Sequence, residues 1–114
     1  MEFETTRQGG ILRINVLAER IDAACAIEFK DRIRELCGEE PPRVILDMQR
    51  VDFLDSSGLG AVVAVMKILG KDRSLELAGL STKVSKVFRL TRMDSVFKIH
   101  PSAAAVMKSN ASAA

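Results

Sequence analysis

The sequence has no Trp, no Tyr, one histidine and two cysteines. Without Tyr or Trp to stack on bases, and with a net charge of only +2 spread among residues of both signs, it lacks the features of a nucleic-acid-binding protein. One histidine and scattered carboxylates provide no metal-ligand set, and no cofactor is expected. No apolar stretch approaches the roughly 20 residues of a membrane-spanning helix, so no membrane insertion is expected.

The N-terminus has no basic-then-apolar layout, so we expect a cytoplasmic protein rather than a secreted one. Cys25 and Cys37 would point about 120° apart on one helix, so both are predicted to be reduced and structural. The chain of 114 residues, with 47% apolar and 28% charged residues, has the composition of one soluble globular domain. We predict this domain over residues 1–108, followed by a frayed Ser/Ala tail at 109–114.

The N-terminal part predicts a hairpin followed by a helix. Strands are expected at residues 3–6 and 11–17, joined by a turn at Gly9 and Gly10, because glycine adopts positive φ without penalty. Asp22 is predicted to be the N-cap of the helix. The inward stripe of that helix is expected to contain Ala26, Phe29, Ile33 and Leu36.

The middle of the chain predicts a buried strand followed by an unusually apolar helix. Val44-Ile45-Leu46 lacks alternation, which is typical of a central strand covered on both faces. Residues 59–69 are aliphatic residues, Gly, Ala and Met apart from Lys67. This helix is therefore either buried on all sides or partly exposed for a partner.

The remaining elements complete a mixed fold. We expect a strand at 75–78, a helix capped by Ser81 or Thr82, an edge strand or extended segment at 96–99, and a last helix opened by Pro101. Together the elements predict a single-domain α/β (α+β) fold with a mixed sheet of four to five strands and about four helices.

The third predicted helix carries two stripes. Its inward residues are expected to be Val84, Val87, Phe88 and Leu90. Its basic residues are Lys83, Lys86, Arg89 and Arg92, which form either a solvated face or a site for phosphate or an acidic partner. The single histidine, His100, is expected at a surface turn or a helix entry.

The segment Asp55-Ser56-Ser57-Gly58-Leu59-Gly60 joins the buried strand to the apolar helix. A nucleophilic serine needs a base, and His100 is the only candidate; the pattern also differs from G-x-S-x-G, so we do not expect an enzyme. An anion site at the glycines lacks a P-loop lysine, and Asp55 would repel the anion. Serines at a helix start are commonly caps, and for Ser57 we expect little more.

Phosphorylation of a hydroxyl remains as the third interpretation. Parallel strands deliver the segments with Asp22 and Asp55 to one rim of the sheet. A phosphate would add about −1.5 to −2 charges to this rim, beside the apolar helix. The predicted chemistry is a switch in which the bare hydroxyl permits binding and the phosphate causes release.

Residues 44–47, the segment 55–60 and the pattern of residues 84–99 resemble the anti-sigma-factor antagonists, which are STAS domains. The resemblance implies a small bacterial regulator of transcription, monomeric when free, that works by partner switching. Its unphosphorylated form would bind an anti-sigma factor that is also a Ser/Thr kinase of the histidine-kinase-like ATPase fold. A PP2C-type phosphatase would restore the hydroxyl. The family's phosphorylated position matches Ser56, with Ser57 as the alternative, and Asp22 matches an acidic rim residue.

The predicted partner-binding residues are Asp22, Asp55, Ser57, Gly58, Leu59, Gly60, Val62 and Val63. Glu19 stands where the family usually has a glycine, and small apolar residues follow at 23–26; these departures concern partner contacts more than the fold. The alternative function is a constitutive STAS interaction subunit of a transport or other membrane-associated complex, not regulated by phosphorylation.

Overall fold

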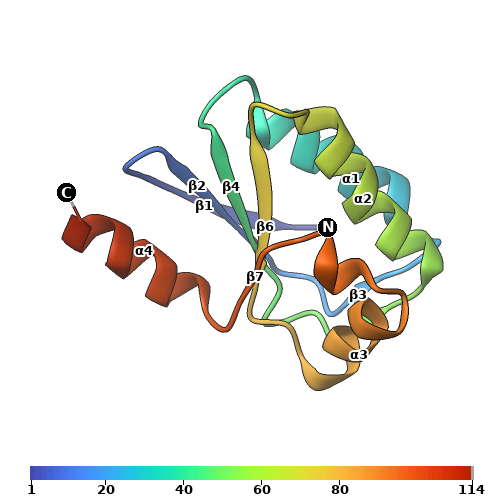
Figure 1. The fold of residues 1–114 in the computed structure, drawn as a ribbon. Helices are drawn as coiled ribbons and strands as arrows, with labels where there is room; N and C mark the ends of the chain where they lie inside the picture. Colours follow the sequence, from blue (N-terminus) through green and yellow to red (C-terminus); the bar gives the residue numbers. More distant parts are fainter. Residues whose placement is uncertain (114) are drawn as a thin grey trace.

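The computed structural model describes residues 1–113, with side chains described as far as Ser109. Within this range the chain forms seven strands, four α-helices and one 3-10 helix (Figure 1). The elements are β1 Phe3–Gln8, β2 Ile11–Val16, β3 Arg20–Ile21, α1 Ala26–Cys37, β4 Arg43–Asp47, β5 Phe53–Leu54, α2 Ser56–Leu69, β6 Ser74–Ala78, α3 Thr82–Leu90, η1 Met93–Ser95, β7 Ile99–His100 and α4 Ala103–Ala113. The predicted frayed tail overlaps the end of α4, where Ala114 lies outside the described residues, so its fraying stays a prediction.

The main sheet has the strand order β1-β2-β4-β6-β7. Only β1 is antiparallel to its neighbour; the other pairs are parallel. The predicted mixed sheet of four to five strands is therefore confirmed. Helices α1 and α2 lie on one side of this sheet and α4 lies on the other (Figure 1).

The central strand β4 is covered on both faces, as its unbroken apolar sequence predicts. Val44 and Leu46 belong to the large core together with residues of α1, α2 and α3. Ile45 points to the opposite face, because side chains alternate along a strand, and there it packs in a smaller cluster with Ala103 and Met107 of α4.

A second, two-stranded sheet of β3 and β5 supports the start of α2. The two strands are parallel, with Ile21 opposite Leu54. Gly58, in the first turn of α2, packs so closely on this sheet that a Cβ atom would collide with the carbonyl oxygen of Ile21. The helix can approach β3 only because residue 58 has no side chain.

The start of α1 differs from the prediction. Asp22 is not its N-cap: the cap residue is Cys25, which makes no side-chain cap hydrogen bond. Asp22 instead accepts a hydrogen bond at Oδ1 from the backbone N–H of Ala24 at 3.1 Å. This local turn, typical of Asp, delays the helix to Ala26.

Two predictions for α3 have different outcomes. Ser81 caps the helix, because its Oγ accepts a hydrogen bond from the N–H of Val84 at 3.1 Å. Leu90 is 75% exposed, so its predicted inward position is wrong. Val84 and Phe88 define the buried face, and two residues beyond Phe88 a helix has turned by about 200°, which directs Leu90 to solvent.

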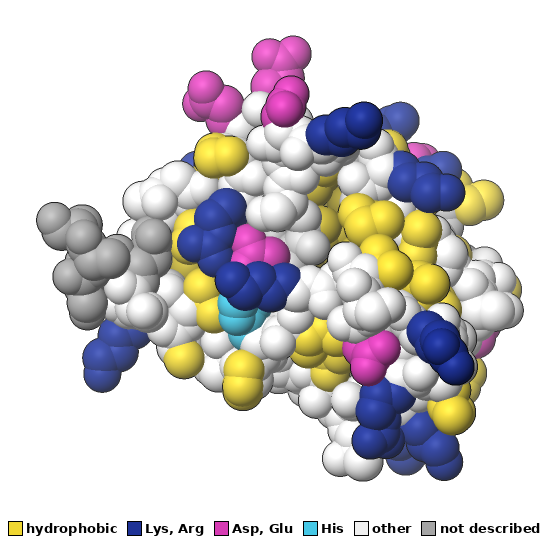
Figure 2. Space-filling view, viewed as in Figure 1, with side chains coloured by type: hydrophobic (Ala, Val, Ile, Leu, Met, Phe, Trp, Pro, Cys, Tyr) yellow, Lys and Arg dark blue, Asp and Glu magenta, His cyan; other side chains and the backbone are white. Residues whose placement is uncertain are grey.

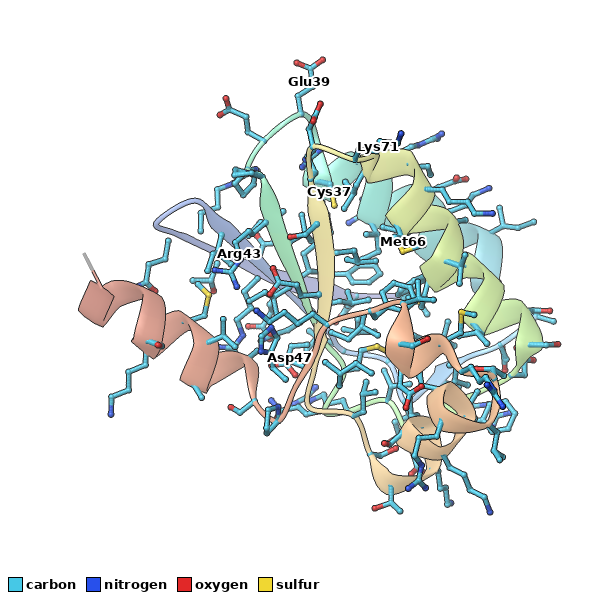
Figure 3. The ribbon with its side chains drawn as sticks, viewed as in Figure 1. Cys37, Glu39, Arg43, Asp47, Met66 and Lys71 are labelled. Carbon is cyan, nitrogen blue, oxygen red and sulfur yellow. The ribbon has the colours of Figure 1, made fainter. Side chains whose placement is uncertain are left out.

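A buried carboxylate organises the sheet face near α4. Glu76 of β6 is 4% exposed and accepts two hydrogen bonds of 2.8 Å from Arg43. His100 Nε2 lies 2.8 Å from Glu76 Oε1, and Figure 2 shows the histidine beside acidic and basic side chains. Figure 3 shows Arg43 and Asp47 at opposite ends of β4. His100 is therefore a strand residue of β7, not part of a surface turn or helix entry as predicted.

The close contact at Gly58 predicts a position-specific loss of stability. Gly58→Ala should lower the free energy of unfolding by about 1–3 kcal/mol, because the methyl group overpacks against the Ile21 backbone. Gly60→Ala is the matched control: a Cβ there meets nothing within 4 Å, so stability should stay unchanged or rise by about 0.5–1 kcal/mol. Urea unfolding measures both, and equal effects would contradict the packing argument.

The Glu76 cluster predicts a pH-dependent stability. The hydrogen bonds from Arg43 hold the pKa of Glu76 at about 2, below its ordinary 4.5. The stabilisation by ionised Glu76 is therefore fully present above pH 4.5 and is lost as the pH falls towards 2. The difference in unfolding free energy between wild type and Glu76→Gln should favour wild type at pH 7 and shrink below pH 4.5 in urea titrations. A difference that does not change with pH would contradict this account.

Candidate functional site

The register of the small sheet brings two acidic residues together. Ile21 lies opposite Leu54, so Asp22 and Asp55 leave the parallel strands β3 and β5 side by side. Asp55 Oδ2 accepts a hydrogen bond from the backbone N–H of Ala23 at 3.2 Å, which ties the two segments directly. The prediction that these segments share one rim is confirmed.

Asp55 is the N-cap of α2. Its backbone is extended, and its Oδ1 accepts a hydrogen bond from the N–H of Gly58 at 2.8 Å. Ser56 and Ser57 are therefore the first two residues of the helix, and the expectation that Ser57 is a cap is wrong. Both serines are exposed, and neither hydroxyl has a hydrogen-bond partner within the described part of the chain.

Asp22 is held in its ionised form. Arg20 Nε donates to Asp22 Oδ2 at 3.2 Å, and this hydrogen bond lowers the pKa of Asp22 below its usual value. The guanidinium of Arg20 also lies over the ring of Phe53, 4.1 Å from its centroid, which fixes its position. At neutral pH the rim around Ser56 therefore carries negative charge beside an uncharged hydroxyl.

Helix α2 is neither fully buried nor an ordinary surface helix. Gly58, Val62, Val65 and Leu69 face the core, while Gly60 and Ile68 are exposed. One shallow groove beside the exposed side is lined by Ser56, Leu59, Gly60, Val63, Ala64, Lys67 and Met93. A second groove, towards α1, is lined by Ala26, Ile27, Lys30, Ser57, Gly60, Ala61 and Ala64. The sequence left two alternatives for this helix, burial on all sides or partial exposure, and the structure shows partial exposure.

The predicted partner-binding residues separate into two groups. Gly58 is buried and Val62 has no exposed surface, so both face the core of the folded protein. They occupy the core side because they are spaced by one helical turn. The other predicted residues, Asp22, Asp55, Ser57, Leu59, Gly60 and Val63, are exposed or half-buried.

Two residues of this surface were missed by the sequence analysis. Ile27 is 73% exposed at the groove between α1 and α2, and Met93 of η1 lines the groove beside Ser56. Ile27 could have been found as a large apolar residue outside the inward stripe of its helix. Met93 gave no such signal, because its position depends on how η1 folds back towards α2.

The single histidine contacts Glu76 in the main sheet instead of either serine. Among the described residues, no three His, Cys, Asp or Glu side chains are grouped so that they could hold a metal ion. The described helices include none with the length and apolar character needed to cross a membrane.

Curated proteins with similar sequences include anti-sigma-B factor antagonists. The protein from Listeria monocytogenes is 31% identical over 84 residues, which cover 73% of this chain and 74% of the relative. The protein from Staphylococcus aureus is 23% identical over 101 residues, covering 88% and 93% of the two chains.

Solved structures with the same fold include small regulatory proteins and a region of a membrane transporter. An anti-sigma factor antagonist from Mycobacterium paratuberculosis aligns with a TM-score of 0.82 at 22% identity, covering 95% of this chain and 92% of that one. The phosphorylated form of the Bacillus cell fate determinant SpoIIAA aligns with a TM-score of 0.68 at 18% identity, covering 94% and 97%. The murine anion transporter Slc26a9 aligns with a TM-score of 0.78 at 16% identity, covering 94% of this chain but 18% of the transporter.

The sequence also matches the model of a protein family, the STAS domain. The match covers residues 2–106, which is almost the whole chain and includes every strand and the first three α-helices. The chain belongs to the STAS domain family, and its relatives from Listeria monocytogenes and Staphylococcus aureus are named anti-sigma-B factor antagonists.

Proposed function

We propose that the protein is a cytoplasmic, non-enzymatic anti-sigma-factor antagonist, monomeric when free, that is switched by phosphorylation of Ser56. The unphosphorylated form binds an anti-sigma factor that is a Ser/Thr kinase of the histidine-kinase-like ATPase fold, and phosphorylation releases that partner. A PP2C-type phosphatase then restores the hydroxyl. The observation that carries the proposal is the exposed Ser56 hydroxyl, which lies on an acidic rim and lines an apolar groove.

The names of the relatives support this role. The curated relatives are named anti-sigma-B factor antagonists, and one protein with the same fold was solved in a phosphorylated form. Ser56 is favoured over Ser57 because it directly follows Asp55 in the motif and lines the groove that reaches Met93.

Electrostatics explain why a phosphate at Ser56 acts on the partner and not on the fold. The N-terminus of α2 carries a partial positive charge, which favours a nearby phosphate by about 0.3–1 kcal/mol. The phosphorylated protein should therefore remain folded. A partner covering the groove would instead have to bury about −1.5 to −2 additional charges next to two carboxylates, and removing such charge from water costs several kcal/mol.

The rival function is a constitutive STAS interaction subunit of a transport or other membrane-associated complex. The same fold occurs in a region of the murine anion transporter, which is a membrane protein. The fold is therefore compatible with such a role. The rival uses the apolar grooves but has no need for a modifiable hydroxyl. Phosphate transfer to Ser56 therefore distinguishes the two functions.

The first expected outcome concerns the site of modification. Incubation with ATP and each kinase of this fold from the same organism should add one phosphate to wild type and none to Ser56→Ala. Ser57→Ala is the matched control and should still be modified, since Ser57 is the neighbouring exposed hydroxyl. Intact-mass and peptide mass spectrometry measure the phosphate. A phosphate on Ser57 would move the site, and no phosphate with any such kinase would favour the constitutive rival.

The second expected outcome concerns charge at the same position. Ser56→Asp should weaken kinase binding by about tenfold or more, while Ser56→Ala should bind like wild type, because only the first adds charge to the acidic rim. Isothermal titration calorimetry gives the dissociation constants, and circular dichroism checks that each variant is folded. Equal binding by wild type and both variants would show that charge at this rim is not the switch.

A further inference from the structure

The basic face of α3 is not explained by the fold or by the Ser56 switch. Val84 and Phe88 hold the helix on the core with no exposed surface. The opposite side displays Lys83, Lys86, Arg89 and Arg92, all of them exposed. Lys83 lies 3.6 Å from Asp52, whereas no salt bridge involves the other three within the part of the chain that the structure describes. Three cations are therefore left without an internal counter-charge.

An exposed apolar side chain lies among these cations. Leu90 is 75% exposed, the largest exposure among the large apolar residues of the described chain. A solvated basic face does not require a leucine at this position. Cations around one apolar side chain are instead complementary to an acidic segment that carries an apolar residue of its own.

The face is continuous with the surface around Ser56. Helix α3 leads through Arg92 into η1, whose Met93 lines the same groove as Ser56. Figure 2 shows Lys and Arg side chains gathered over α3, below an apolar area over α2 and η1. One partner can therefore cover the groove and reach the basic face at the same time.

We propose that the α3 face, formed by Lys86, Arg89, Leu90 and Arg92, binds an acidic segment of the same partner that covers Ser56. The inference rests on the proposed function for the identity of that partner, but not for the existence of the site. An anionic membrane is a poorer occupant, because Val84 and Phe88 of α3 are buried in the core and Leu90 is the one large apolar residue of this helix that is exposed.

A peptide titration tests the site without the partner. The probe is a short synthetic peptide of Asp and Glu with one central Leu, followed by amide NMR shifts of the full chain. Shifts should concentrate in α3 and η1 and disappear when salt rises from about 0.05 to 0.5 M. Lys86→Glu/Arg89→Glu should weaken binding by about tenfold, whereas Lys71→Glu/Lys108→Glu, with the same change in net charge on exposed residues elsewhere, should not.

Other results of this titration overturn the proposal. They are shifts spread over all cationic surfaces, equal losses in the two double variants, or no shifts in α3. Binding to phosphatidylglycerol vesicles tests an anionic membrane as the alternative occupant of the α3 face. Vesicle binding that depends on Lys86 and Arg89, without peptide shifts in α3, would assign the face to a membrane and overturn the acidic segment.

Arg92 separates a binding role from a structural one. It adopts the left-handed conformation with φ of 60°, where glycine is favoured over other residues. Arg92→Gly should therefore leave the unfolding midpoint unchanged or raise it, while peptide binding weakens. A lower midpoint together with unchanged peptide binding would mean that Arg92 serves the fold, and would remove it from the site.

The partner arm distinguishes failure of this inference from failure of the proposed function. With a kinase that phosphorylates Ser56, Lys86→Glu/Arg89→Glu should bind less tightly than Lys71→Glu/Lys108→Glu. Equal binding by the two double variants would overturn the shared-partner inference while leaving the Ser56 switch intact. If no such kinase binds wild type but the peptide still binds at α3, the proposed function fails and the shared partner is overturned with it, leaving only a site for acidic segments.

Discussion

The carboxylate of Asp55 joins the two segments from which the functional surface is built. One oxygen accepts from the N–H of Gly58 and begins α2, and the other accepts from the N–H of Ala23 in the segment before α1. The bare backbone of Gly58 lets the helix approach Ile21 closely enough for both bonds. The cap has a second consequence, because it satisfies the helix end without using a serine. The hydroxyl of Ser56 is thus left free at the surface.

The apolar residues of helix α2 contribute both to the core and to the exposed surface. Its buried positions recur at the helical period, while Gly60 and neighbouring small residues form the floor between two shallow grooves. An apolar surface of this kind gains free energy when a partner covers it. A charged group at its edge reduces that gain, because the charge must be desolvated or left outside. The proposed switch requires only this local competition, with no rearrangement of the fold.

The charges of the protein are segregated over this surface. Asp22 is kept ionised by Arg20, so the rim near Ser56 is acidic. The exposed side of α3 is basic and lies beyond η1. Elsewhere an ionised carboxylate has a structural role: Glu76 is buried and paired with Arg43 and His100 on the sheet face near α4. The only histidine of the sequence therefore contacts a carboxylate of the main sheet.

The sequence by itself determined the mixed sheet, the doubly covered β4, the inward residues Phe29 and Ile33, and the shared rim of Asp22 and Asp55. These features follow from the local apolar pattern, the order of the elements and the geometry of parallel strands. Strands β3 and β5 have two residues each, too few for any period to show. Which aspartate caps its helix, and which side of α3 bears Leu90, depended on where the backbone met the core. The contact of His100 with Glu76 joins residues on neighbouring strands. Only the tertiary structure decided these features, because each depends on contacts between segments far apart in the sequence or on where an element starts relative to the core.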